Sequence, residues 1–254
     1  MKTILLSLVI LFSSTVFAQN RQYYQLKIYS FENEAQQNAA DSFLEKTYLP
    51  ALKRHKITNT GVFKPREIDS SGIKKTYVLT AYNSLHQFEA LDSLLLNDPI
   101  YLKSGRSFLD LPYDSLPYIR VSSILLKAFE KHPILTPTKL EGSRTDRVYE
   151  LRSYESATEK IYRNKVAMFN AGGEVALFDK LNFNPIFYGE VLSGDQMPNL
   201  MYMTTFENQE SRDAHWKKFG DSPEWNAMKT LPKYQNNVSH MDITFLYPTS
   251  YSDY

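Results

Sequence analysis

The chain has 254 residues, of which 43% are hydrophobic and 22% are charged, a composition typical of globular proteins that excludes disordered and fibrous classes. Its 29 Lys and Arg residues nearly balance 28 Asp and Glu residues. The net charge of +1 therefore gives no electrostatic reason to expect nucleic acid or an anionic membrane surface as a partner. The absence of Cys excludes disulfides, thiolate metal sites and a cysteine nucleophile.

Residues 1–18, MKTILLSLVILFSSTVFA, have the pattern of a secretory signal peptide. Lys2 precedes an apolar run, and Val16-Phe17-Ala18 is a cleavage signal of the small-x-small type before Gln19. The run is shorter than the roughly 20 apolar residues that span a bilayer, and we expect no membrane span elsewhere. We therefore expect cleavage near Ala18/Gln19 and an exported, periplasmic or extracellular protein with a mature net charge of zero.

Two halves of the chain repeat one pattern at an offset of 124 or 125 positions, which indicates internal duplication. The matched segments are 24–29 (YQLKIY) with 149–154 (YELRSY), 77–82 with 201–206, and Asp98-Pro99 with Ser222-Pro223. Residues 132–144 contain Pro133, Pro137 and Gly142 and are predicted to be a linker. The predicted units are 19–131 and 145–254.

The first unit alternates strand and helix patterns. Period-two alternation predicts a strand over 23–31, and an apolar stripe at helical spacing follows it. The stripe comprises Ala40, Phe43, Leu44, Tyr48, Ala51 and Leu52. Pro50 lies within this helix and should kink or restart it. A short strand beginning at Gly61, a strand over 76–82, a helix containing Phe88 to Leu95 and a strand over 118–129 complete the unit.

The second unit has the same order of elements. Its predicted elements are a strand over 148–154, a helix from about Thr158 to Gly172-Gly173, helical residues 174–181, strands over 185–192 and 200–206, a helix carrying Trp216 and Trp225, and a strand over 238–247. The order β-α-β-β-α-β is the ferredoxin-like split motif, whose sheet has helices on one face only. The bare face of each unit needs a cover. We therefore predict an α+β protein in which two ferredoxin-like units pack sheet to sheet.

Several of these segments resemble the NIPSNAP family. Residues 48–54 (YLPALKR) followed by 61–65 (GVFKP) are similar to its exported bacterial branch, and the second unit looks like the NIPSNAP domain proper. The segments that carry the second match are 149–154, Phe187-Tyr188-Gly189-Glu190, and the cluster Arg212, His215, Trp216, Phe219, Pro223, Glu224 and Trp225. The first unit departs from the pattern because it has no Trp. The resemblance implies a dimeric α/β-barrel built from ferredoxin-like units, either two in one chain or one per subunit. Because this chain has two units, we expect the barrel to form within one chain, and a homo-oligomer stays open.

Alternation along the strands also separates an apolar set from a polar set. We assign Tyr24, Leu26 and Ile28, with their counterparts Tyr149, Leu151 and Ser153, to the helix-covered face. The opposite, bare face then carries Gln25, Lys27, Tyr29, Arg120, Ser122, Glu150, Arg152, Tyr154, His240, Asp242 and Thr244. Charges buried between two sheets must be paired or lie beside water. The polar face is therefore either a paired interior that fixes docking or a ligand cavity.

The candidate site residues follow from this polar face and from the tryptophan helix. The candidate ligand-binding residues are Glu150, Arg152, Tyr154, Glu190, Tyr202, His215 and Trp216. His240 beside Asp242 is the candidate catalytic base, because a carboxylate can hold imidazole in one tautomer. Core packing is the favoured role of Trp216 and Trp225. The sequence contains no HExxH, P-loop, Rossmann glycine fingerprint or GxSxG motif, so we expect no metal and no cofactor.

Three functions remain open at this point. The first is an exported protein that binds a small apolar or aromatic ligand, or a partner, in or around the barrel interior. The second is a cofactor-independent oxygenase or isomerase, since barrels of this type host such enzymes, although a fold alone does not assign a function. The third is a purely structural interaction module. A cavity of roughly a few hundred Å³ lined by His240, Arg152 and Tyr154 would favour the first two, and a filled interior with every polar group paired would favour the third.

Overall fold

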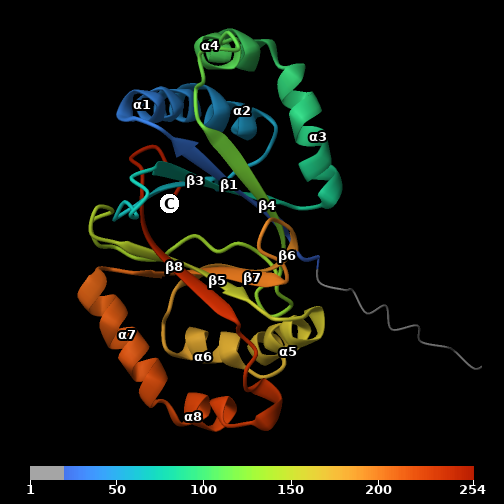
Figure 1. Ribbon diagram of the computed structural model, residues 1–254, viewed down its shortest axis with the longest axis vertical. Coiled ribbons are helices and arrows are strands. Elements are labelled where there is room, and N and C mark those ends of the chain that lie inside the picture. The colour runs from blue at the N-terminus through green and yellow to red at the C-terminus, as the bar shows by residue number, and fades with distance from the viewer. Residues whose placement is uncertain (1–19) are drawn as a thin grey trace, which may run out of the picture.

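The computed structural model describes residues 20–254, so the predicted signal peptide and its cleavage site lie outside the described residues. Eight strands close into an antiparallel barrel in the order β1-β3-β2-β8-β5-β7-β6-β4 (Figure 1). The strands are β1 (Tyr23–Phe31), β2 (Gly61–Pro65), β3 (Lys74–Tyr82), β4 (Arg120–Ala128), β5 (Val148–Glu155), β6 (Pro185–Ser193), β7 (Asn199–Phe206) and β8 (His240–Pro248). Closure leaves no unpaired sheet edge.

The helices form two groups on opposite sides of the barrel, α1 to α4 on one side and α5 to α8 on the other (Figure 1). They are α1 (Glu34–Phe43), the π-helix η1 (Leu44–Tyr48), α2 (Leu49–Arg54), α3 (Leu85–Leu96), α4 (Pro99–Leu109), α5 (Glu159–Asn170), α6 (Glu174–Lys180), α7 (Gln209–Asp221), α8 (Pro223–Lys229) and the 3-10 turn η2 (Pro232–Tyr234). Among residues 20–254, no helix combines the length and hydropathy needed to cross a bilayer.

The predicted fold is confirmed. Strands β4-β1-β3-β2 and β8-β5-β7-β6 each have the ferredoxin-like order, and the β2–β8 and β4–β6 pairs join the two sets into one barrel. Each set therefore supplies the cover that the other lacks. At the β4–β6 junction, Gly189 lies so close to Leu126 that an added Cβ would be 3.0 Å from the Leu126 Cβ.

Proline positions explain the helix boundaries. Pro50 lies in the first turn of α2, directly after the π-helical segment, because it has no N–H to donate to the preceding turn. Asp98 and Ser222 cap α4 and α8 with their side-chain oxygens, and Pro99 and Pro223 follow at the first helical position. The prediction of one helix carrying both Trp216 and Trp225 is therefore wrong, since the Ser222-Pro223 break divides α7 from α8.

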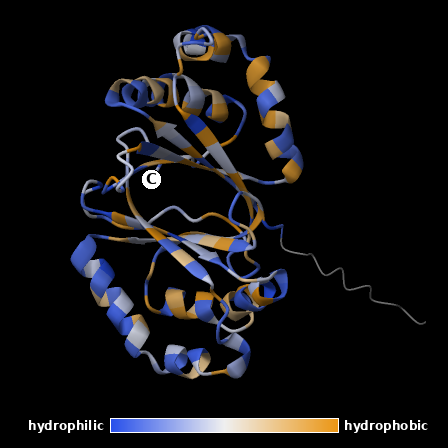
Figure 2. Ribbon diagram, viewed as in Figure 1, coloured by the Kyte–Doolittle hydropathy of each residue, from blue (hydrophilic) through white to orange (hydrophobic). Residues whose placement is uncertain are grey.

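The predicted assignment of the strand faces is wrong for the opening strand of each unit. Tyr24, Leu26, Tyr149 and Leu151 lie inside the barrel in one apolar cluster. The alternating residues of the same strands face the helices instead; for example, Tyr154 packs in the cluster under α5 to α7. The physical reason is that the interior of an eight-stranded barrel is just wide enough for large apolar side chains such as Tyr24 and Tyr149 to fill it at one end. Figure 2 shows hydrophobic residues along the strands and a largely hydrophilic α7.

The remaining predicted polar residues do face the barrel interior. In the β5–β8 ladder, Thr244 pairs with Leu151, Asp242 with Ser153 and His240 with Glu155, so all share the inner face. Ser122 and Arg120 are likewise in register with Ile28 and Ser30 of β1. The polar face expected from the sequence therefore combined residues from opposite sides of the sheet. These inner residues all lie toward one end of the barrel.

Candidate ligand site at the barrel mouth

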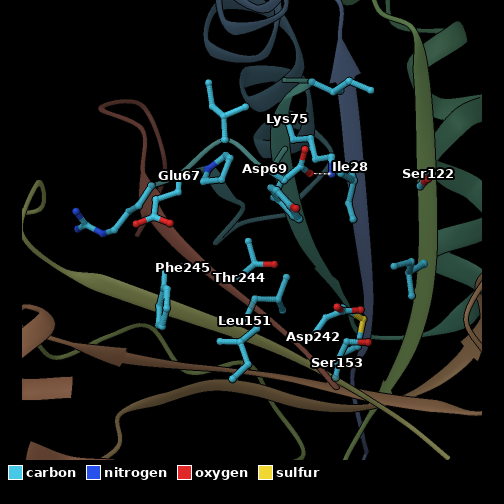
Figure 3. Close-up of a pocket in the computed structure, with 18 of the residues that line it drawn as sticks. Ile28, Glu67, Asp69, Lys75, Ser122, Leu151, Ser153, Asp242, Thr244 and Phe245 are labelled. Carbon is cyan, nitrogen blue, oxygen red and sulfur yellow. Dashed lines mark hydrogen bonds and ion pairs between the residues drawn. The ribbon is translucent and has the colours of Figure 1, made fainter. Parts of the chain in front are cut away.

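One end of the barrel is filled and the other is open. At the filled end the Tyr24 and Phe187 ring centroids are 5.4 Å apart, those of Phe63 and Tyr149 are 5.0 Å apart, and Tyr254 packs on Phe63. At the other end a cavity of about 580 Å³ opens among the strand ends (Figure 3). Small-molecule sites in proteins are typically roughly 300–1,000 Å³, so this end, the barrel mouth, has the capacity of a ligand site.

Side-chain size along the strands explains why the cavity lies at this end. The inner positions of β1, β4 and β5 change from Tyr24, Leu126 and Tyr149 at the filled end to Ile28, Ser122 and Ser153 at the cavity. The inner wall of the cavity is formed by Ile28, Ser122, Ile124, Leu151, Ser153, Met201 and Thr244. This wall combines an apolar base with a few hydroxyl groups, the usual lining of a site for a small organic molecule.

The loop between β2 and β3 closes part of the mouth. The Nζ of Lys75 donates to the Asp69 Oδ2 at 2.8 Å (Figure 3). This hydrogen bond, with those from Ser71, lowers the pKa of Asp69 to about 2. Burial raises the pKa of Tyr77, which lies on β3 below the loop. The lining includes the acids Glu67, Asp69, Asp195 and Asp242 but only the bases Arg66 and Lys75. The rim is therefore acidic overall.

Six residues between the barrel and helices α5 to α8 form a cluster that we name the closed cluster: Glu150, Arg152, Tyr154, Tyr202, Arg212 and Trp216. Glu150 is fully buried, and its carboxylate accepts hydrogen bonds from Arg152 Nε at 2.6 Å, Arg212 Nε at 2.8 Å and Trp216 Nε1 at 2.8 Å. Burial alone would raise the pKa of Glu150, but the hydrogen bonds from Arg212 and Trp216 and the Arg charges hold it below its usual value.

The rest of the closed cluster completes a paired network. Arg152 Nη1 donates to the Tyr154 hydroxyl at 2.9 Å, and the Tyr154 and Tyr202 hydroxyls are 2.8 Å apart. The Arg152 guanidinium carbon lies 3.7 Å from the centroid of the Trp216 ring. Burial raises the pKa of Tyr202 well above its ordinary value. None of these residues lines the mouth cavity. The geometry is that of a structural core that fixes α7 on the barrel.

The other two predicted ligand residues also lie away from the cavity. Glu190 on β6 pairs with Arg21. His215 on α7 has its Nδ1 2.6 Å from the Ser211 carbonyl oxygen, to which it donates, and its ring packs on Phe206. The structure therefore brings none of the seven predicted ligand-binding residues to the cavity, and a ligand role for them stays a prediction.

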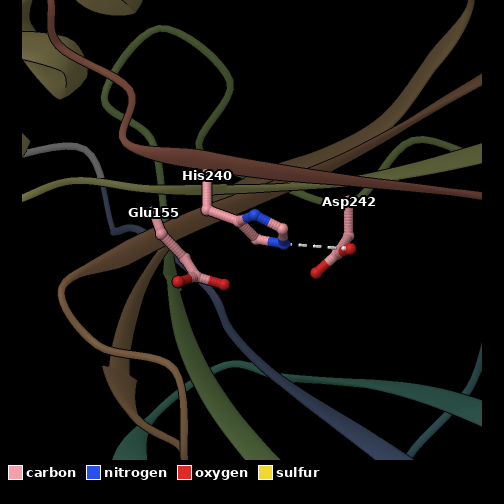
Figure 4. A group of neighbouring side chains, drawn as sticks. All are labelled: Glu155, His240 and Asp242. Carbon is pink, nitrogen blue, oxygen red and sulfur yellow. Dashed lines mark hydrogen bonds and ion pairs between the residues drawn. The ribbon is translucent and has the colours of Figure 1, made fainter.

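The predicted catalytic pair does lie at the mouth. His240 Nε2 is 3.3 Å from Asp242 Oδ1, and both side chains are about half exposed. Of the two, Asp242 lines the cavity and His240 does not. Glu155, directly across from His240 in the β5–β8 ladder, brings a third side chain to this place (Figure 4). Glu155 is not among the candidates predicted from the sequence, although it continues the inner series Leu151 and Ser153 with period two.

Known proteins are similar to this chain in two ways. Residues 149–253 match the sequence profile of the NIPSNAP family, and no curated protein is significantly similar to the chain. Among solved structures, a candidate monooxygenase from Lactobacillus acidophilus NCFM superposes with a TM-score of 0.57 at 11% identity, covering 90% of this chain and 94% of that one.

Two further structures cover similar shares. A candidate monooxygenase from Fusobacterium nucleatum has a TM-score of 0.54 at 9% identity over 90% of this chain and 92% of its own. An anthrone oxidase-like protein has a TM-score of 0.51 at 9% identity over 91% and 93%. At such identities the likeness establishes the barrel fold alone.

Proposed function

We propose that this chain, whose residues 149–253 form a NIPSNAP domain, binds a small molecule with an apolar or aromatic body in the mouth of its barrel. The observation that carries the proposal is a barrel filled at one end only, with a cavity of about 580 Å³ over an apolar base at the other. Apolar ligand surface buried there contributes about 25 cal/mol per Å² before the costs of association. A purely structural module gains nothing from such a cavity.

The rim indicates which polar group the ligand carries. Ser153 and Thr244 offer hydroxyls beside the apolar wall, and Asp242 offers a carboxylate. An acidic rim disfavours an unaccompanied anionic group, because like charges repel at short range. The preferred ligand is therefore neutral or cationic, with a hydrogen-bond donor such as a hydroxyl or an amine.

Binding of a neutral apolar fluorophore tests this function. We expect N-phenyl-1-naphthylamine to bind saturably, with a dissociation constant on the order of micromolar. Leu151→Trp places a larger side chain in the cavity and should weaken binding at least about tenfold, or 1.4 kcal/mol. The matched control is Ile100→Trp on the exposed side of α4, which should bind as the wild type does. Unchanged affinity in a folded Leu151→Trp protein contradicts the proposal.

A second candidate function is an oxygenase or isomerase that works without a cofactor. It is favoured by His240, which lies 3.3 Å from the cavity-lining Asp242 in the arrangement of a base held by a carboxylate. The name of the anthrone oxidase-like neighbour suggests anthrone as a test compound, with oxygen uptake as the assay. His240→Ala should abolish uptake and leave fluorophore binding intact. Uptake that survives this substitution excludes His240 as the base.

Export is part of the proposal. The pattern of residues 1–18 supports cleavage before Gln19 and a periplasmic or extracellular location. Expression of the full chain in a bacterial host, followed by intact-mass measurement of the extracytoplasmic fraction, should give a protein that begins at Gln19. A cytoplasmic protein that keeps residues 1–18 would exclude export.

A further inference from the structure

We propose that Glu155, His240 and Asp242, named here the mouth triad, bind a divalent transition-metal ion at the rim of the barrel. One ligand atom from each side chain lies within 4.8 Å of the others, so rotation of these side chains would bring all three to a single ion (Figure 4). The side chains are solvent-accessible, which gives an ion a path of entry. The site goes beyond the proposed ligand binding and does not depend on it.

The fold holds the mouth triad in place. Glu155 ends β5 and His240 begins β8, and the two residues pair directly in the antiparallel ladder. Asp242 is two residues further along β8, so it projects from the same face of the sheet. All three ligands therefore come from two hydrogen-bonded strands of a closed barrel and not from loops.

The donor set selects the class of ion. One imidazole nitrogen and two carboxylates suit first-row divalent ions such as Zn²⁺, Mn²⁺ and Co²⁺, whereas Ca²⁺ and Mg²⁺ prefer oxygen ligands alone. His240 Nε2, which faces Asp242 at 3.3 Å, is the nitrogen available for the ion. A positive ion would also offset the negative charge that Glu155 and Asp242 place on the same face.

A neighbouring buried amide points to a ligand independently. Asn199 begins β7 and pairs with Glu155 in the β5–β7 ladder, which puts both side chains on the same face. It is only 3% exposed, and its Nδ2 donates to Ser153 Oγ at 2.8 Å. Its Oδ1 has no hydrogen-bond partner within residues 20–254. A buried carbonyl oxygen without a partner is costly, and a metal-bound water beside Glu155 would satisfy it.

The first half of the barrel provides an internal comparison. In its ladders Ser30 pairs with Arg120 and with Lys75, as Glu155 pairs with His240 and with Asn199. The equivalent positions of the first half therefore carry cationic side chains, which repel a metal ion. Within the described residues, the ligand set of the mouth triad occurs in the second half and has no counterpart in the first half, so the shared fold does not by itself produce it.

Metal titration of the mature chain tests the site. After treatment with EDTA and its removal, calorimetry with Zn²⁺ should give one ion per chain, and Co²⁺ should give visible absorption bands that Zn²⁺ abolishes. Both titrations contain no organic ligand, so their failure and the failure of fluorophore binding are separate results.

Matched variants identify the ligands. Glu155→Gln and His240→Ala should each weaken binding at least tenfold, while the folded state is checked by circular dichroism. His86→Ala, at an exposed position of α3, is the matched control and should bind as the wild type does. No saturable binding, or binding unaffected by both triad substitutions, would overturn the proposal. The second result would identify an adventitious surface ion.

Discussion

Strand β5 presents Glu150, Arg152 and Tyr154 to the helix layer and Leu151, Ser153 and Glu155 to the barrel interior. On the outer face the Glu150 carboxylate is fully buried and accepts hydrogen bonds from two guanidinium groups and an indole. On the inner face the polar groups border a cavity and solvent. The polar atoms of the outer face are therefore already paired within the protein, whereas those of the inner face are accessible to a ligand. This difference distinguishes the closed cluster, which is structural, from the candidate site at the mouth.

The largest expected effect is on the outer face. Glu150→Ala leaves Arg152 and Arg212 without their shared carboxylate, and breaking a buried pair costs about 3–5 kcal/mol. Glu155→Ala, on the inner face and at the rim, should change the free energy of unfolding by less than about 0.5 kcal/mol. Urea unfolding at pH 7 measures both. Equal costs for the two substitutions would break the comparison.

The pH dependence of stability sharpens the comparison between the two faces of β5. Because the pKa of Glu150 is lower in the folded state, its contribution is present above the unfolded value of about 4.3 and is lost as the pH falls toward the folded value. Each unit of difference corresponds to about 1.4 kcal/mol. The free energy of unfolding should therefore fall more steeply below pH 4.3 in the wild type than in Glu150→Gln. Parallel curves would remove Glu150 as a source of acid sensitivity.

A smaller effect is expected at Tyr154. Tyr154→Phe removes the hydroxyl that links Arg152 to Tyr202 and should cost about 1 kcal/mol. Since the residue faces the helices, affinity for N-phenyl-1-naphthylamine should stay as in the wild type. A loss of fluorophore binding in this variant, with the fold intact, would mean that the closed cluster and not the mouth holds the ligand.

The smallest effect on stability is expected at Asp242. Its side chain is about half exposed and its pairing with His240 is solvated, so Asp242→Asn should change the free energy of unfolding by less than about 0.5 kcal/mol. The same substitution should weaken Zn²⁺ binding at least tenfold. A large loss of stability without any loss of metal affinity would assign Asp242 a structural role.

The sequence predicts the architecture well because the duplication repeats both the strand pattern and the pair of an N-cap residue followed by proline, Asp98-Pro99 and Ser222-Pro223. It cannot assign the strand faces, because β5 is buried from Val148 to Tyr154 and β7 is buried throughout, so both faces have a similar demand for burial. Period two separates the two sets but does not say which faces inward. Glu155 was missed because the predicted strand ended at Tyr154, one residue short.

Methionine methyl groups report on the barrel mouth and on the second helix group in one spectrum. Met201 lines the mouth cavity, whereas Met168 of α5 and Met228 of α8 pack together within the helix layer. In protein labelled with ¹³C at the methionine methyls, titration with N-phenyl-1-naphthylamine should shift the Met201 signal and leave those of Met168 and Met228 in place. Shifts of Met168 and Met228 with an unmoved Met201 would contradict the assignment of the ligand site to the barrel mouth.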